Sequence, residues 1–241
     1  MKKRIFIAGT IFAAMIFASC GVSNKTITRY QRLEEGVSSP TTVEELKTAI
    51  KKYQERVADI QLANSQIGIW YKMLGTRYID QKMYGEALKC FQEALKYYPD
   101  NQNLYFYVGV CAGYMSHAAL DFGASGSSEV SYNYLKLAEE AYLRAIAIEE
   151  RYVRALYGLG ILYVYELEEP EKAIPYLERA VSIETRNIDA MFALANAYWA
   201  SYEFDKSAAM FDKIIATTKS AERKATAEEN KKQVLDALYS R

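Results

Sequence analysis

The chain offers few side chains that could carry catalytic or metal-binding chemistry. It contains one histidine, His117, and three cysteines, Cys20, Cys90 and Cys111. No Ser or Cys nucleophile motif surrounds His117, and the cysteine spacing fits no metal site, so we expect neither nucleophilic catalysis nor a bound metal. Cys90 and Cys111 are either small buried thiols or, in an oxidising compartment, a disulfide pair. The residue types therefore predict a protein that is not an enzyme and needs no cofactor.

Cys20 is the cysteine whose neighbouring residues indicate a covalent modification. Residues 2–4 are basic, and residues 5–17 form an apolar stretch of the length found in signal peptides. The segment from Phe17 to Gly21 resembles the bacterial lipobox, although Phe17 stands where that pattern usually has Leu. The resemblance implies removal of residues 1–19 and attachment of diacylglycerol and an N-acyl chain to Cys20. An ordinary cleaved signal peptide and a retained anchor are the alternatives.

Lipidation would fix where the protein resides. Loss of residues 1–19 removes three positive charges and lowers the formal net charge from 0 to −3, which gives no electrostatic reason to bind nucleic acid or anionic lipid. The acyl chains would therefore do the anchoring. Gly21 rather than Asp follows the cysteine, and by the sorting rule of enteric-type lipoproteins this implies the outer membrane of the bacterial envelope, facing the periplasm.

The segments after Cys20 predict a tether followed by a helix. Residues 20–41 are rich in Ser, Thr and Gly and are expected to be a flexible tether. Thr42 and Glu45 have the spacing of a capping box, and apolar residues then alternate in steps of three and four as far as Ile60. We expect residues 42–66 to form an N-terminal capping helix that ends in a turn near residues 63–65.

A 34-residue pattern follows this helix. Its eight signature positions in residues 68–101 are Tyr71, Leu74, Gly75, Tyr78, Ala87, Phe91, Ala94 and Pro99. The pattern recurs from Leu156 to Ala180, with one extra residue assigned to the loop around Glu168–Pro170, and more weakly from Met191 to Ile214. It resembles the tetratricopeptide repeat (TPR), with Tyr71 in place of the usual Trp. The resemblance implies an all-α, right-handed superhelix of helix–turn–helix units.

The second repeat is interrupted. Tyr105 and Gly109 open it, but Ala138 and Tyr142, which close it, come 17 residues late, so residues 115–137 are predicted to be an insert with helical extensions around a Gly/Ser loop. The insert either contacts a partner or is a tolerated surface insertion. We expect four repeats over residues 68–220 and a C-terminal capping helix over residues 221–241.

In tetratricopeptide proteins the first helix of each pair lines a concave groove, and the same register can be applied to this chain. It predicts a groove that is rich in aromatic rings and poor in charge, suited to an apolar peptide segment or a flat ligand. In the alternative interpretation these rings only pack against neighbouring helices. The predicted groove residues are Lys72, Phe106, Tyr107, Tyr114, Arg154, Tyr157, Tyr165, Phe192, Asn196 and Trp199.

Together the lipobox and the repeats resemble bacterial TPR-containing lipoproteins that act as envelope scaffolds. This resemblance implies a membrane-anchored adaptor for envelope or periplasmic proteins. A weaker likeness is to the T-components of TRAP transporters, which would make the chain an accessory of periplasmic solute uptake and would require a closed pore or pocket. A purely structural envelope protein is the third alternative.

Overall fold

The computed structural model describes residues 40–121 and 127–239, and every regular element in these two stretches is a helix. The all-α prediction is therefore confirmed. The chain divides after Gln61 into two compact units. The helices are α3 (Val43–Asp80), α4 (Tyr84–Leu95), α5 (Gln102–Asp121), α6 (Ser127–Ile148), α7 (Val153–Ile161), a π-helical turn (Leu162–Glu166), α8 (Pro170–Ile183), α9 (Ile188–Ala200), α10 (Phe204–Thr217) and α11 (Ala221–Tyr239).

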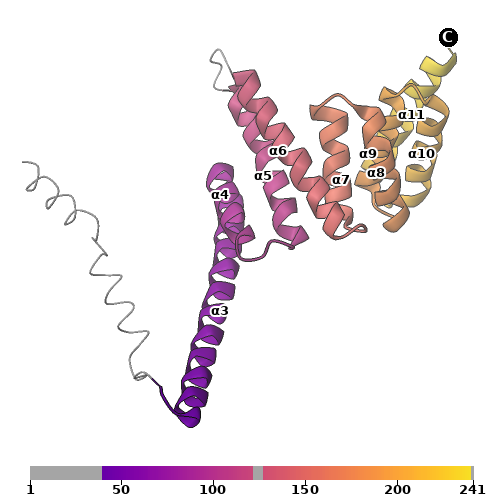
Figure 1. Cartoon of the computed structure of the whole chain (residues 1–241). Helices are drawn as coiled ribbons and strands as arrows, with labels where there is room; N and C mark the ends of the chain where they lie inside the picture. Colours follow the sequence, from indigo (N-terminus) through magenta and orange to yellow (C-terminus); the bar gives the residue numbers. More distant parts are fainter. Residues whose placement is uncertain (1–39, 122–126, 240–241) are drawn as a thin grey trace, which may run out of the picture. The chain divides into compact units, whose positions relative to one another are not determined.

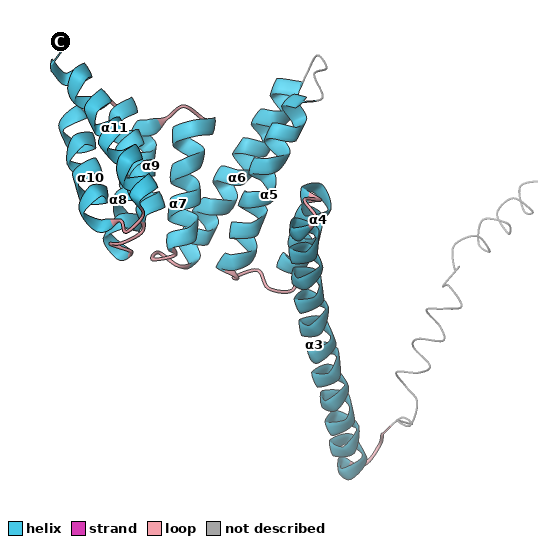
Figure 2. Cartoon of the chain, turned by 180° about the vertical axis from the view of Figure 1, so that it is seen from behind, coloured by secondary structure: helices cyan, strands magenta, loops and turns pink. Residues whose placement is uncertain are grey.

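The second unit, which begins at Leu62, is an array of stacked helical hairpins. α5 packs on α6, α7 on α8 and α9 on α10, and each hairpin also packs on the next one (Figure 1). The reverse view in Figure 2 shows the same order ending at α11, which packs on α10. Each hairpin thus buries its apolar surface against its sequence neighbours, as expected of a repeat protein.

Small residues allow the paired helices to cross closely. A Cβ atom on Gly75 would lie 2.8 Å from the ring of Phe91, and one on Gly160 would lie 2.4 Å from the side chain of Leu177. In the last pair the small residue is Ser207, which is fully buried and donates a hydrogen bond from its hydroxyl to the carbonyl of Ala195 at 2.9 Å. Because this hydroxyl is satisfied, serine replaces alanine there without leaving an unpaired polar group.

Three hairpins use the same three-residue turn. Its middle residue has a positive φ in each case: 59° at Lys82, 55° at Glu168 and 61° at Tyr202. The extra residue of the third repeat was assigned to this loop, and that assignment is wrong. It is accommodated in the π-helical turn Leu162–Glu166, where the N–H of Leu167 donates to the carbonyl of Leu162 five residues earlier.

The capping box at the start of α3 is present. The N–H of Glu45 donates to Oγ1 of Thr42 at 3.3 Å, and the N–H groups of Thr41 and Thr42 donate to Oε2 of Glu45 at 2.9 and 3.0 Å. These bonds, led by the one from Thr41, lower the pKa of Glu45 to about 2. The predicted turn at residues 63–65 is wrong, since α3 continues without a break to Asp80. That the first part of α3 caps the repeat array stays a prediction.

The predicted insert consists largely of helix. α5 extends to Asp121 and α6 begins at Ser127, so the two helical extensions are present, while residues 122–126 of the Gly/Ser loop lie outside the described residues.

Cys90 and Cys111 are buried free thiols, and burial raises the pKa of Cys111 to about 12. Within the described part of the chain, no helix has both the length and the apolar character needed to cross a bilayer.

The shared turn leads to a testable expectation for stability. A non-glycine residue in the left-handed region is strained by roughly 1–2 kcal/mol, and glycine relieves this strain while gaining unfolded-state entropy. We expect Lys82→Gly to raise the free energy of unfolding by about 0.5–1 kcal/mol, measured by urea denaturation. Gln81→Gly in the same turn, at ordinary φ, is the control and should not stabilise the protein. Equal effects of the two substitutions would contradict the assignment of strain.

Candidate binding groove

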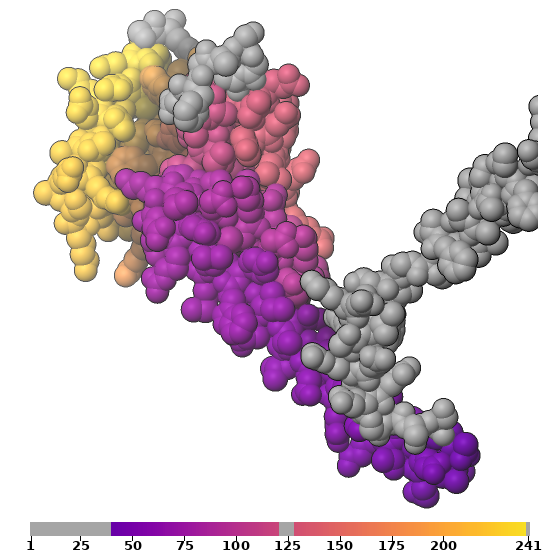
Figure 3. All heavy atoms as spheres, turned by 90° about the vertical axis from the view of Figure 1, so that its left-hand side faces the viewer, coloured from indigo at the N-terminus to yellow at the C-terminus, as the bar shows by residue number. Residues whose placement is uncertain are grey.

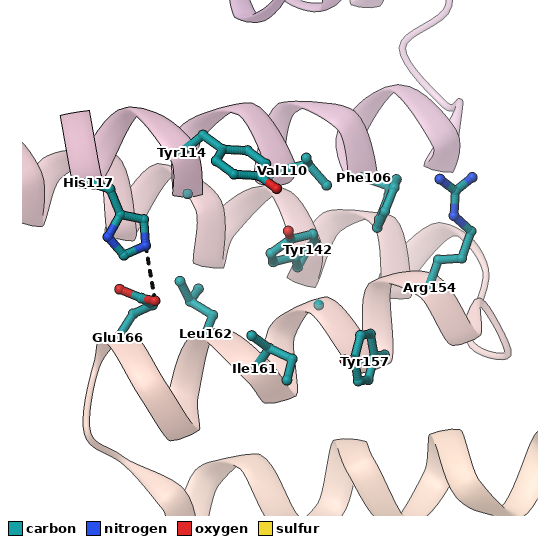
Figure 4. Close-up of a pocket in the computed structure, with 13 residues that line it drawn as sticks. Phe106, Val110, Tyr114, His117, Tyr142, Arg154, Tyr157, Ile161, Leu162 and Glu166 are labelled. Atoms are coloured by element: carbon teal, nitrogen blue, oxygen red, sulfur yellow. Dashed lines mark ion pairs between the residues drawn. The ribbon is translucent and has the colours of Figure 1, made fainter. Parts of the chain in front are cut away.

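The first helices of the second and third repeats enclose a hollow of about 400 Å³ (Figure 4). One wall is the face of α5 that carries Phe106, Val110 and Tyr114, and the other is formed by Tyr157 and Ile161 of α7. The remaining lining residues are Gly109, Gly113, His117, Tyr142, Arg154, Gly158, Leu162 and Glu166. Aliphatic and aromatic side chains therefore form most of its surface.

Tyr142 of α6 forms the floor of this hollow. Its ring fits between two glycines, because a Cβ atom would lie 2.6 Å from the ring at Gly109 of α5 and 2.9 Å from it at Gly158 of α7. The residue is 6% exposed. Burial raises the pKa of Tyr142 well above its usual range, so the hydroxyl stays protonated and can donate to a ligand.

Arg154 supplies a positive charge at one end of the hollow. Its guanidinium carbon lies 4.2 Å from the centre of the Phe106 ring and 5.4 Å from that of Tyr107. These cation–π contacts hold the side chain against the aromatic wall, although Arg154 as a whole remains exposed. A ligand in the hollow would therefore meet a fixed cation at this end.

The other end carries an ion pair between two different repeats. Nε2 of His117 on α5 lies 3.2 Å from Oε1 of Glu166 in the π-helical turn (Figure 4). No sequence motif assigns a role to His117 or singles out Glu166. The one available signal was the extra residue between Tyr163 and Ala173, because the π-helical turn that accommodates it contains Glu166.

A second hollow, of about 480 Å³, continues along the same side of the array. It shares Tyr157 and Ile161 with the first hollow. Its other lining residues come from the π-helical turn, from α9 and from α11: Tyr165, Asp189, Phe192, Ala193, Glu222, Arg223 and Thr226. The guanidinium of Arg223 lies 2.9 Å from Asp189, so an ion pair joins α11 to α9 at this end of the groove.

The structure brings most of the predicted groove residues together. Phe106, Tyr114 and Arg154 line the first hollow, Tyr165 and Phe192 line the second, and Tyr157 lines both. Asn196 lies beside them, since its Nδ2 donates to the hydroxyl of Tyr165 at 2.6 Å.

The other predicted site residues lie elsewhere. Tyr107 stacks on Phe91 with ring centres 4.8 Å apart and so packs within the hairpins. Trp199 packs on Phe204 with centres 5.0 Å apart, and Lys72 lines a separate hollow of about 250 Å³. Cys20 lies outside the described residues. Which of these residues bind a partner stays a prediction.

Stacked helical hairpins with a groove along their first helices define the class of the protein, a helical repeat scaffold. Comparison with family models identifies the repeat. Residues 69–101 and residues 165–227 each match a model of the tetratricopeptide repeat. The chain therefore contains tetratricopeptide repeats at these residues, and the repeat type inferred from the sequence spacing is confirmed.

Relatives and solved structures agree with this assignment. A TPR repeat-containing protein of Borreliella burgdorferi (strain B31) is 24% identical over an alignment of 229 positions that covers 93% of this chain and 94% of the relative. Among solved structures, the fold resembles YrrB, described as a TPR protein with an unusual peptide-binding site (TM-score 0.53, 21% identity, 78% of this chain and 85% of that chain). It also resembles MamA from Desulfovibrio magneticus RS-1 (TM-score 0.54, 15% identity, 73% and 97%). At these identities the structures show a shared fold.

The glycines around Tyr142 provide a matched test of the hollow's floor. Gly109→Ala forces a methyl group against the ring, which costs about 1–3 kcal/mol, and improved helix propensity offsets at most about 1 kcal/mol of that. Gly113, one turn later on α5, has no atom within 4 Å of the added Cβ. We therefore expect Gly113→Ala to be neutral or stabilising and Gly109→Ala to be clearly less stable in urea denaturation. Similar midpoints for the two variants would show that Tyr142 is not confined.

Proposed function

We propose that the protein is a lipid-anchored adaptor of the bacterial envelope that binds an extended, largely apolar segment of a partner protein. The proposal rests on two adjoining hollows that lie along the first helices of the repeats and have aromatic walls. Tetratricopeptide repeats are typically non-catalytic scaffolds that bind proteins or peptides, which supports recognition rather than catalysis as the role of this groove.

The lining indicates how a segment would be held. Apolar side chains of the partner gain free energy by burial against Phe106, Tyr157 and Ile161, at roughly 25 cal/mol per Å² of area removed from water. Polar groups at fixed points of the groove would set the direction in which the segment binds. The Tyr142 hydroxyl can donate to a backbone carbonyl, and Arg154 would attract an acidic group at one end. Such a site selects by shape and orientation more than by net charge.

The groove is accessible, which favours the adaptor over a solute-transport accessory. The transport alternative requires a closed pore or pocket. Tyr114 beside the first hollow and Tyr165 beside the second are each 50% exposed, and His117 is also exposed. An extended peptide can enter such an open groove along its length, whereas a small solute would remain in contact with water.

The groove proposal can be tested with selected peptides. A library of random linear peptides is panned against the purified full chain, and the affinities of the selected peptides are measured by fluorescence polarisation. We expect Gly113→Phe to weaken binding at least tenfold, because its ring enters space that is empty beside the hollow. Ala147→Phe, at an exposed position of α6 outside both hollows, is the matched control and should bind like the wild type.

Two results would contradict the groove proposal. One is a set of selected peptides whose affinity is unchanged by Gly113→Phe, which would place the contact elsewhere. The other is a loss of affinity that is equal in Gly113→Phe and Ala147→Phe. Circular dichroism of both variants verifies that the helices are intact, so that weaker binding reports the groove itself.

The anchor is tested separately. If Cys20 is acylated, cells that express the protein should incorporate labelled palmitate into it, and fractionation should recover it with the outer membrane. Cys20→Ser should abolish the label and release the protein from the membrane fraction, whereas Cys90→Ser should change neither. A protein that carries no label, or keeps it in the Cys20→Ser variant, would exclude lipidation at this position.

A further inference from the structure

The first part of α3 carries a stripe of exposed apolar side chains, defined here as Val43, Leu46, Ile50, Tyr53, Val57 and Ile60. Each of them is between 38% and 66% exposed. Figure 3 shows the surface of this helix in indigo. A contiguous apolar stripe of this kind on a water-soluble surface is a common mark of an interaction site.

The spacing of the stripe identifies the kind of interaction. The steps between its members are three, four, three, four and three, which is a period of 3.5 residues. An isolated straight helix has 3.6 residues per turn, so a strict 3.5-residue period stays on one side only if the helix winds around a partner helix. The stripe therefore has the spacing of the a and d positions of a left-handed coiled coil.

The residue types indicate a second copy of this helix as the partner. Val43, Ile50 and Val57 at the a positions are all β-branched, and β-branched a positions combined with leucine at d, as at Leu46, favour two parallel strands. The same register places Asn64 at the next a position. An asparagine at a single a position pairs with its counterpart in the other strand and so fixes the register and a two-stranded state.

The residues beside the stripe are compatible with this pairing. In a parallel pair, each g position faces the e position of the next heptad on the other strand. Ala49 would then face Gln54, and Arg56 would face Gln61, so no two like charges meet. The charged residues of both signs at Glu44, Glu45, Lys51, Lys52, Glu55 and Asp59 occupy b, c and f positions, away from the seam.

We propose that two copies of the chain associate through a parallel, in-register coiled coil that begins at Val43 and includes Asn64. Dimerisation would present two binding grooves on one assembly, and a partner with two docking segments would then bind more tightly than either groove alone provides. The coiled coil itself rests on α3 and does not depend on the proposed use of the groove.

Disulfide trapping of the full chain tests both the pairing and its register. Ile50→Cys places identical residues opposite each other in the coiled coil, and mild oxidation should convert most of the protein to a covalent dimer. Thr48→Cys lies at an f position on the far side of the helix and is the matched control. The wild type, with its own three cysteines, is oxidised in parallel to measure the background.

Mass measurement by light scattering, in a mild detergent, gives the second test. The wild type should have twice the mass of a single chain, which denaturing mass spectrometry of the same sample provides. Ile50→Glu combined with Val57→Glu should give the mass of one chain with unchanged helix content. Thr48→Glu, which adds a charge outside the stripe, should leave the dimer intact.

Several outcomes would overturn the proposal. A wild type of single-chain mass excludes the dimer, and a trimer excludes the two-stranded form. Equal yields of covalent dimer from Ile50→Cys and Thr48→Cys would show that the chains meet by random collision. A disulfide between the cysteine of Ile50→Cys and another cysteine of the same chain would show that the stripe packs within its own chain. The Cys20→Ser variant can also be tested for binding to phosphatidylcholine vesicles. If it is a monomer that binds them, and if replacing Ile50 and Val57 by Glu abolishes this binding, then the stripe contacts a membrane and not a second chain.

Discussion

The contact on which the groove depends is the ring of Tyr142 held between Gly109 and Gly158. The two glycines belong to successive repeats, and the tyrosine comes from the helix that packs behind both. Because any side chain at either glycine would meet the ring at less than 3 Å, only this combination lets α5, α6 and α7 approach so closely. One ring therefore joins two repeats and closes the floor of the hollow.

The π-helical turn shows how an extra residue can change a repeat without changing its hairpin. The three-residue turn, with its left-handed middle residue, is the same at Lys82, Glu168 and Tyr202. It is closed by a hydrogen bond from the N–H of the third turn residue to the carbonyl of the signature tyrosine, which is Tyr78, Tyr163 or Tyr198, at 2.8 Å in all three hairpins. Since the turn is preserved, the added residue is accommodated in the helix before it, in the segment that supplies Glu166 to the ion pair with His117.

The sequence was sufficient to predict the repeats because their contacts are local and recur at fixed spacing. Gly75 with Phe91 and Gly160 with Leu177 follow directly from the signature positions, and the structure has both contacts. The groove was only partly predictable. Register places a residue on a helix face but does not give its side-chain direction, so Tyr107 was assigned to the groove although it stacks on Phe91. The ion pair between His117 and Glu166 joins residues that are 49 positions apart, and no local sequence pattern predicts such a contact.

The failure of the predicted turn near residues 63–65 has a similar physical reason. The prediction placed the turn between the capping-helix pattern, followed as far as Ile60, and the repeat pattern, whose first signature position is Tyr71. A boundary between two sequence patterns does not by itself interrupt backbone hydrogen bonding. Glycine in a left-handed conformation and proline do so, and residues 61–67 contain neither. The helix therefore continues, and Tyr71 and Leu74 keep the steps of three and four that begin at Val43. From Tyr71 onward this spacing serves the hairpin that α3 forms with α4, where Gly75 meets Phe91. From Val43 to Ile60 the same spacing leaves apolar side chains exposed, and this is the surface on which the proposed partner helix would pack.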